Sequence, residues 1–240
     1  MNKDETIRIN AYISQSTSLS RRKADEAIEE GRVLLNGKRA NLGDRVGVSD
    51  VVTLDGSTVE PYEKHTTYAL NKPKGYVCSS YDPHIRHYAR NLINVEECER
   101  LHSIGRLDKD SEGLILFTTD GNLTLKITHP KNGIEKEYYV KTAEKVSSKD
   151  INAMLKGISS DGDFLKVKDV TQMSPRELLL VLTEGKNREI RRIMEALGNK
   201  VDRLVRLRIG GYSMPLNLKE GQYKRLSESE INKIFEGVKK

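Results

Sequence analysis

The chain has 240 residues and a formal net charge of +6, which suits one or two domains and weakly favours a polyanionic partner. Its two cysteines form no CxxC pair and have no His cluster beside them, so we expect no disulfide framework, no zinc site and a cytoplasmic location. No apolar run reaches the roughly 18 residues of a membrane span, and the polar first residues do not form a signal peptide.

Two short helices are predicted near the start of the chain. Residues 7–13 have the apolar spacing of an amphipathic helix. Ser20 can cap a second helix over residues 21–30, and Gly31 would end it. Both helices carry an apolar stripe, so we expect them to pack into one small core.

Strands follow these helices. Residues 33–35 run into Asn36-Gly37, which predicts a strand entering a type I′ hairpin turn. Residues 51–54 predict a further strand. The polar residues after it include Gly and Pro and are typical of a linker. We therefore predict a small α+β domain over residues 1–60 and a linker over residues 61–66.

Three cations begin the second predicted helix. A helix N-terminus carries partial positive charge, so each exposed cation there costs about 0.3–1 kcal/mol unless a phosphate binds beside it. The alternative is an ordinary solvated face. However, the segments Ser20-Arg21-Arg22-Lys23-Ala24-Asp25, Gly31-Arg32-Val33 and Asn36-Gly37-Lys38 resemble the S4 RNA-binding domain. The resemblance implies phosphate contacts with structured RNA, for which the candidates are Arg21, Arg22, Lys23, Arg32, Lys38 and Arg39.

The rest of the chain, residues 67–240, mixes predicted strands and helices without a repeating βαβ unit. This order favours an α+β fold with a largely antiparallel mixed sheet flanked by helices. The clearest elements are strands at 68–70, 114–117, 138–140 and 177–182 and a helix at 187–197.

A charged loop precedes the strand at 114–117. It reads Gly105-Arg106-Leu107-Asp108 and continues to Gly113. A short loop that enters a buried strand can present a carboxylate from a rigid support. Taken alone, Asp in a glycine-bounded turn is also ordinary turn chemistry.

The strand at 138–140 alternates charged and aromatic residues. Lys136 and Tyr138 share one face, with Glu137 and Tyr139 on the other. A Tyr ring stacked on a nucleic-acid base contributes about 1–3 kcal/mol. The alternative is an edge strand with a packed Tyr.

The helix at 187–197 combines an apolar stripe with three arginines. At about 100° per residue, Arg191 falls beside the stripe, whereas Arg188 and Arg192 point outward. Arg191 is therefore expected to be half-buried and to need a carboxylate, either that of Asp108 or, as an ordinary helix pair, that of Glu195. We expect the two outward arginines to face solvent or phosphate.

Four ordered segments resemble the RsuA/RluB/RluF-type family of ribosomal RNA pseudouridine synthases. They are Leu70-Asn71-Lys72-Pro73-Lys74-Gly75, Gly105-Arg106-Leu107-Asp108 with Ser111-Glu112-Gly113-Leu114, Glu135-Lys136-Glu137-Tyr138, and Glu184-Gly185-Lys186-Asn187-Arg188-Glu189-Ile190-Arg191-Arg192. The family's reaction detaches uracil from C1′, rotates it and rejoins it through C5. The resemblance implies no metal and no cofactor.

The resemblance also implies roles for particular residues. Asp108 falls on the catalytic aspartate, acting as nucleophile or base. Tyr138 falls on the active-site aromatic that stacks on the target uracil and is a candidate for proton transfer. Arg191 falls on the residue that pairs with the aspartate. The uridine is expected to leave its stack to enter the site. The residues expected to contact the substrate are Arg106, Lys136, Ile190, Lys72, Lys186, Arg188 and Arg192.

Several alternatives remain open in the sequence. The expected substrate is 23S ribosomal RNA, with 16S ribosomal RNA as the alternative, and the expected state is a monomer without membrane or small-molecule partners. A different class of function is a non-catalytic S4-domain RNA-binding or ribosome assembly factor, which would need no pairing of Asp108 with Arg191. Residues 79–100 match no motif.

Overall fold

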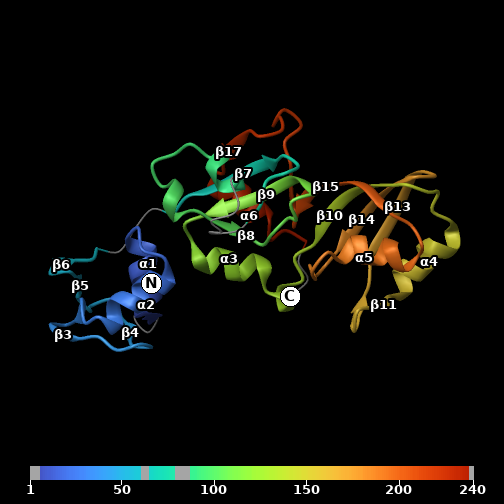
Figure 1. Ribbon diagram of the computed structural model, residues 1–240. Helices are drawn as coiled ribbons and strands as arrows, with labels where there is room; N and C mark the ends of the chain where they lie inside the picture. Colours follow the sequence, from blue (N-terminus) through green and yellow to red (C-terminus); the bar gives the residue numbers. More distant parts are fainter. Residues whose placement is uncertain (1–5, 61–64, 79–86, 238–240) are drawn as a thin grey trace. The chain divides into compact units, whose positions relative to one another are not determined.

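The structure is a computed structural model that describes residues 6–60, 65–78 and 87–237 (Figure 1). The chain divides into two compact units: residues 1–66 with 96–101 and 119–121, and the remainder. Within the described residues, no helix is long and apolar enough to cross a membrane. Most of the predicted linker and the segment 79–86 lie outside these residues.

The smaller unit contains the two predicted helices, α1 (Ile9–Ser16) and α2 (Arg21–Glu29). The side chain of Ser20 accepts a hydrogen bond from the Lys23 N–H at 3.3 Å, which confirms the predicted cap. Gly31 follows α2 with φ +75°, a conformation that favours glycine. The buried residues of both helices pack against Val33, Val46 and Val52 of the strands, which closes the small core.

Short antiparallel strands complete the smaller unit. Asn36 and Gly37 both have positive φ, of 51° and 76°, which confirms the type I′ turn between the first two strands of the sheet. The sheet order is β3-β2-β5-β6, and β1 pairs separately with β4. The strands are β1 (Ile7–Arg8), β2 (Val33–Leu35), β3 (Lys38–Arg39), β4 (Arg45–Val46), β5 (Val52–Leu54) and β6 (Ser57–Thr58).

The larger unit is built on one nine-stranded sheet. Its main order is β13-β14-β10-β15-β9-β7-β17, with β16 beside β15 and β8 beside β9. Among the described strands of this sheet, only β15 and β9 pair in parallel, so the predicted largely antiparallel mixed sheet is confirmed. The strands are β7 (Thr67–Lys72), β8 (His102–Ile104), β9 (Glu112–Thr118), β10 (Lys136–Thr142), β13 (Asp169–Ser174), β14 (Glu177–Leu182), β15 (Val201–Ile209), β16 (Tyr212–Ser213) and β17 (Tyr223–Arg225).

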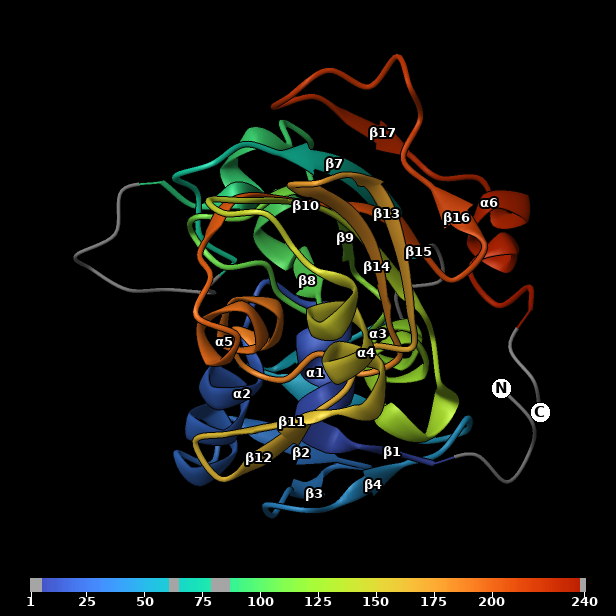
Figure 2. The same ribbon diagram turned by 90° about the vertical axis from the view of Figure 1, so that its right-hand side faces the viewer.

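Helices α3 (Gly121–Thr128), α4 (Ser148–Lys156) and α5 (Glu189–Ala196) lie on one side of this sheet (Figure 2). The α6 helix (Glu228–Lys233) instead packs near β16 at the end of the chain. Leu123 and Ile127 of α3 join Leu114 and Leu116 of β9 in one core cluster. Three short 3₁₀ turns complete the helical elements, at Ala89–Leu92, Cys98–Arg100 and Pro130–Asn132.

The α5 helix begins later than the sequence predicts. Arg188, placed inside the predicted helix, has φ +48° and ψ 32°, so it is the cap and α5 starts at Glu189. A left-handed residue cannot continue a right-handed helix, and no hydrophobic pattern records such a conformation. At the other end, Gly198 has φ +73°, which confirms the predicted glycine stop.

A two-stranded hairpin, β11 (Ile158–Ser160) with β12 (Asp163–Leu165), is attached to α5. Arg192 forms ion pairs with Asp161 at 3.2 Å and with Asp163 at 2.8 Å, and it also donates to the Ser160 carbonyl. The pairing lowers the pKa of the Asp163 carboxyl, because the guanidinium favours its charged form. Arg192 therefore fixes the hairpin to the helix that carries Arg188 and Arg191.

Candidate active site

The loop before β9 presents Asp108 from a backbone that is hydrogen-bonded at consecutive carbonyl groups. The Ser111 N–H donates to the Asp108 carbonyl at 3.0 Å and closes a tight turn. The Gly75 N–H donates to the Lys109 carbonyl at 2.8 Å. Leu107, on the other side of Asp108, is buried and anchors the loop in the core.

Two buried cations complete this support. Arg191 Nη2 donates to the Asp110 carbonyl at 3.0 Å, and Lys72 Nζ donates to the Ser111 carbonyl at 2.6 Å. The four carbonyl oxygens of residues 108–111 are thus all bonded, two of them by charged donors from separate segments of the chain. Such bonds are stronger than neutral ones, so the backbone around Asp108 is fixed by bonds in which the Asp108 side chain takes no part.

The Asp108 side chain is 36% exposed, and its ion pair is with Arg188 rather than Arg191. The nearest charged atoms, Arg188 Nη1 and Asp108 Oδ2, are 3.9 Å apart, and the Arg188 side chain is 43% exposed. At this separation the pair is a loose one, which contributes little to stability. The Arg188 guanidinium makes no hydrogen bond to any residue that the structure describes, so its donors are available to a ligand.

The predicted ion pair between Asp108 and Arg191 is not formed, and neither is the alternative pair with Glu195. Arg191 is buried, at 9% exposure, which is deeper than the half-buried position that the helical spacing predicts. Its guanidinium bonds instead to the carbonyl oxygens of Asp110 and Val201. A buried cation needs hydrogen-bond acceptors, and for Arg191 these are backbone carbonyl groups rather than a carboxylate. Arg191 therefore positions the loop that carries Asp108.

A row of residues from three of the sequence segments crosses the sheet beneath this loop. Tyr138 of β10 pairs with Arg206 of β15, Arg206 pairs with Gly113 of β9, and Gly113 pairs with Lys72 of β7. Directly opposed residues on neighbouring strands project from the same face of a sheet. Tyr138 is therefore two strands away from the strand that the Asp108 loop enters.

Arg206 belongs to this candidate site, although the sequence patterns did not predict it there. It is 4% exposed, its Nε donates to the Leu114 carbonyl at 2.7 Å, and its Nη2 has no partner among the described residues. A buried guanidinium beside Tyr138 raises the positive potential of this face. The pattern Leu204-Val205-Arg206-Leu207 could have indicated a buried arginine, because one charged residue interrupts an apolar run.

Lys136 and Glu189 add an unusual pair of ionisable groups to the same face. Burial lowers the pKa of the Lys136 amine to about 8, and the charge of Arg206 adds to the shift. Burial raises the pKa of the Glu189 carboxyl, whose Oε2 accepts from the Lys186 N–H and whose Oε1 has no partner within the described parts of the chain. Ile190, next to Glu189, is buried at 3% exposure.

Comparison with known proteins identifies the family of the chain. Residues 66–196 match the RNA pseudouridylate synthase family, and residues 7–52 match the S4 domain. The chain belongs to the RNA pseudouridine synthase family. It is an RNA-binding isomerase of the RsuA type, with an S4 domain in front of the synthase domain.

Relatives of this pseudouridine synthase cover nearly the whole chain. It is 39% identical to the dual-specificity RNA pseudouridine synthase RluF of Escherichia coli strain K12 over 235 residues, or 97% of this chain and 79% of that protein. It is 34% identical to the ribosomal large subunit pseudouridine synthase B of Buchnera aphidicola over 90% of each chain. A crystal structure of a pseudouridylate synthase matches with a TM-score of 0.71 and 31% identity, covering 95% of this chain and 99% of that one.

Three residues that the sequence predicts as substrate contacts bind the synthase itself. Lys72 is fully buried and also donates to the Pro73 carbonyl at 2.9 Å, so the prediction that it contacts RNA is wrong. Its amine was needed to bind the loop carbonyls. Lys186 donates to the Phe164 carbonyl at 2.6 Å, and Arg192 binds the β11–β12 hairpin. Arg106, beside Asp108, is exposed.

The predicted RNA contacts of the S4 domain also divide into two groups. Arg32 binds Asp55 through two nitrogens, at 2.7 and 2.6 Å, and Arg39 donates to the Glu29 carbonyl at 2.7 Å. Lys23 forms an exposed ion pair with Glu26 at 3.0 Å. The remaining three are exposed and have no side-chain partner among the described residues: Arg21, Arg22 and Lys38.

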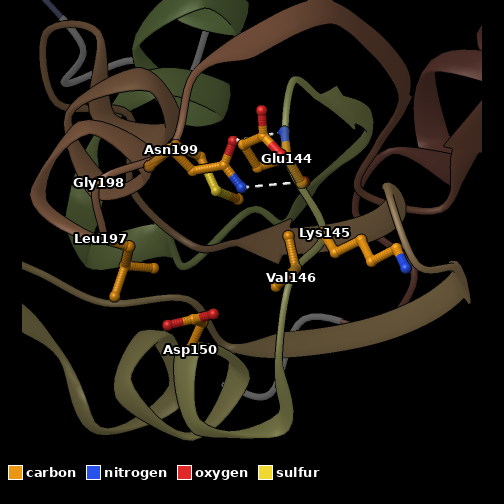
Figure 3. Close-up of a pocket in the computed structure, with 8 residues that line it drawn as sticks. Glu144, Lys145, Val146, Asp150, Leu197, Gly198 and Asn199 are labelled. Carbon is orange, nitrogen blue, oxygen red and sulfur yellow. Dashed lines mark hydrogen bonds between the residues drawn. The ribbon is translucent and has the colours of Figure 1, made fainter.

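A small hollow of about 80 Å³ lies at the C-terminal end of α5 (Figure 3). Glu144, Leu197 and Asn199 line it. The Asn199 side chain is already bonded to the backbone of Glu144 through both its oxygen and its nitrogen. The hollow is therefore a structural feature, at the opposite end of α5 from Arg188 and Glu189.

Replacing Lys72 with Met is expected to destabilise the synthase by about 1–3 kcal/mol, because two buried carbonyl oxygens lose their charged donor. Urea denaturation measures this loss. Lys74→Met, two residues along and more exposed, is the matched control and should stay within about 0.5 kcal/mol of the wild type. Equal stability of the Lys72 variant and the wild type would contradict the proposed support of the loop.

Replacing Arg188 with Gly is expected to raise the free energy of unfolding while lowering turnover. A residue with a side chain in the left-handed conformation destabilises the folded state by about 1–2 kcal/mol, and glycine removes this strain. The greater freedom of glycine in the unfolded chain offsets about 0.5–1 kcal/mol of that gain. Urea denaturation and a turnover assay test the two effects separately. Arg188→Lys retains the strain and should leave stability unchanged. A glycine variant less stable than the wild type would refute the strain.

Proposed function

We propose that this synthase isomerises a specific uridine of 23S ribosomal RNA to pseudouridine, with Asp108 as the catalytic group acting on a flipped-out nucleotide. In this reaction the N1–C1′ bond breaks, a C5–C1′ bond forms, a proton leaves C5 and N1 gains a proton. The carboxylate attacks or deprotonates the sugar to release the base. The uridine must leave its stack to reach such a group.

One observation carries this proposal. The backbone of residues 108–111 is bonded at every carbonyl, yet the Asp108 side chain is partly exposed and has only a loose partner. Fixed geometry with a free reactive group is what a catalytic carboxylate requires. A turn that served structure alone would use its side chain to bond its own backbone.

The proposal assigns roles to the surrounding residues. Tyr138 stacks on the uracil, and Arg106 and Arg188 contact the flanking phosphates with their free donors. Arg21, Arg22 and Lys38 hold the RNA through the S4 domain, which we place at residues 1–60, with a linker at 61–66 and the synthase domain at 67–240. We further propose a monomer that works in the cytoplasm without a metal or cofactor.

The test is pseudouridine mapping at single-nucleotide resolution in RNA from cells with and without this gene. Loss of one site in 23S ribosomal RNA is the expected result, and loss of a site in 16S ribosomal RNA would correct the substrate. All cellular RNA should be mapped, because the RluF relative is named for dual specificity. No lost site in any RNA would refute the proposal.

A further inference from the structure

Lys136 is the one amine of the catalytic face that the protein leaves without a bonding partner among its described residues. It is the first residue of β10 and lies two positions before Tyr138, so both side chains project from the same face. The amine of Lys72, the other lysine of this face, donates to two carbonyl oxygens. Lys136 is partly buried, yet its amine forms no hydrogen bond or ion pair with any described residue.

Three charged groups act on Lys136, from β15, from α5 and from the loop before α5. Arg206 of β15 opposes its charge, whereas Glu189 of α5 and Glu184 before α5 favour it. Burial is the largest effect, and with Arg206 it outweighs the two carboxylates, so the pKa of the amine falls to about 8. The neutral amine, which can accept a proton, therefore becomes abundant as pH rises through 8, whereas an ordinary lysine is almost entirely protonated there.

The reaction needs such a group. When C5 joins C1′, C5 still carries its hydrogen, and the aromatic ring is restored only after that proton leaves. A carboxylate engaged with the sugar is not free to accept it. None of the four residues in the row that crosses the sheet is a carboxylate. Glu189, whose charge acts on Lys136, is buried, and one of its oxygens has no partner among the described residues.

We propose that Lys136 is the catalytic base that takes the proton from C5 of the uracil. The inference rests on the proposed function, because it concerns the same flipped uridine. The C5–H electron pair returns to the ring, the Lys136 amine becomes an ammonium, and N1 is protonated from solvent or by that ammonium. No oxidant, metal or other reactant is needed. Glu189 stabilises the ammonium while it exists.

The test compares Lys136→Arg with the wild type under single-turnover conditions, using a ribosomal RNA fragment that contains the mapped uridine. Arginine keeps the positive charge but does not act as a base at these pH values. We expect the rate constant to fall about 10²–10⁴-fold. We also expect the wild-type rate to rise between pH 7 and 9 and this rise to disappear in the variant. Lys141→Arg, an exposed lysine on the same strand, should match the wild type.

Deuterium at C5 of the uridine separates catalysis from structure. Loss of the base should make proton removal slower than the other steps, so the isotope effect should be larger in Lys136→Arg than in the wild type. Lys136→Ala should regain rate when ethylamine is added. A near-normal rate in the arginine variant would overturn the role of Lys136. So would a slow rate in the variants if the pH profile and the isotope effect stayed unchanged and ethylamine gave no rescue. Absence of activity in the wild type would instead refute the proposed function.

Discussion

Replacing Asp108 with Asn is expected to abolish pseudouridine formation, with turnover falling by about 10⁴-fold or more, the scale seen when a nucleophile or its base is removed from other enzymes. The amide is nearly the same size as the carboxylate, but it neither attacks carbon nor accepts a proton at neutral pH. The four carbonyl bonds of the loop do not involve the Asp108 side chain, so the fold should be unaffected. Pseudouridine in a ribosomal RNA fragment is the quantity to measure.

Asp110→Asn is the matched control for this variant. Asp110 lies in the same loop and binds Arg191 only through its backbone carbonyl, which the substitution keeps. We expect near-normal turnover for it, and RNA affinity within a few-fold of the wild type for both variants. Near-normal turnover of the Asp108 variant would show that another group performs the reaction. Equal loss in both variants would point to a requirement for loop charge rather than for one carboxylate.

The sequence predicted much of this site because several patterns were local. Alternation along a strand was enough to place Lys136 and Tyr138 on one face, and helical spacing was enough to place Arg191 at the edge of the apolar stripe of its helix. The caps at Ser20 and Gly198 were readable for the same reason, since each depends on residues within one turn. The mixed sheet followed from the order of elements and the absence of βαβ repeats.

Other features depend on residues that are far apart in the chain. Periodicity says that Arg191 needs an acceptor, but the identity of that acceptor depends on a loop 81 residues away. The same holds for Lys72, whose amine was expected to contact RNA and instead binds a carbonyl 39 residues along. The left-handed conformation of Arg188 sets the start of α5, and no residue type in the sequence indicates this conformation. Sequence patterns thus predicted which side chains are buried and on which face of an element they lie, but not which residues they bind.

The pairing of β9 with β15 at Gly113 is expected to be the point of the synthase fold that is most sensitive to substitution. Gly113 has φ +96°, and a Cβ atom there would lie 2.4 Å from the Arg206 carbonyl oxygen and 2.8 Å from the Arg206 nitrogen. These are backbone atoms, which cannot rotate away as a side chain does. Gly113→Ala must therefore separate the parallel strands that carry the catalytic loop and Arg206. We expect a loss of about 3–5 kcal/mol in the free energy of unfolding.

Gly75→Ala separates backbone strain from this collision. Gly75 has nearly the same φ, +91°, but a Cβ atom there would meet nothing within 4 Å. Its variant should lose only the strain, about 1–2 kcal/mol. Urea denaturation of both variants gives the difference, which isolates the close approach of the two strands. If the two losses were equal, glycine would be needed at position 113 only for its φ. A larger loss at Gly113 would instead show that the contact between β9 and β15, which places Asp108 and Tyr138 on one framework, permits no side chain at this position.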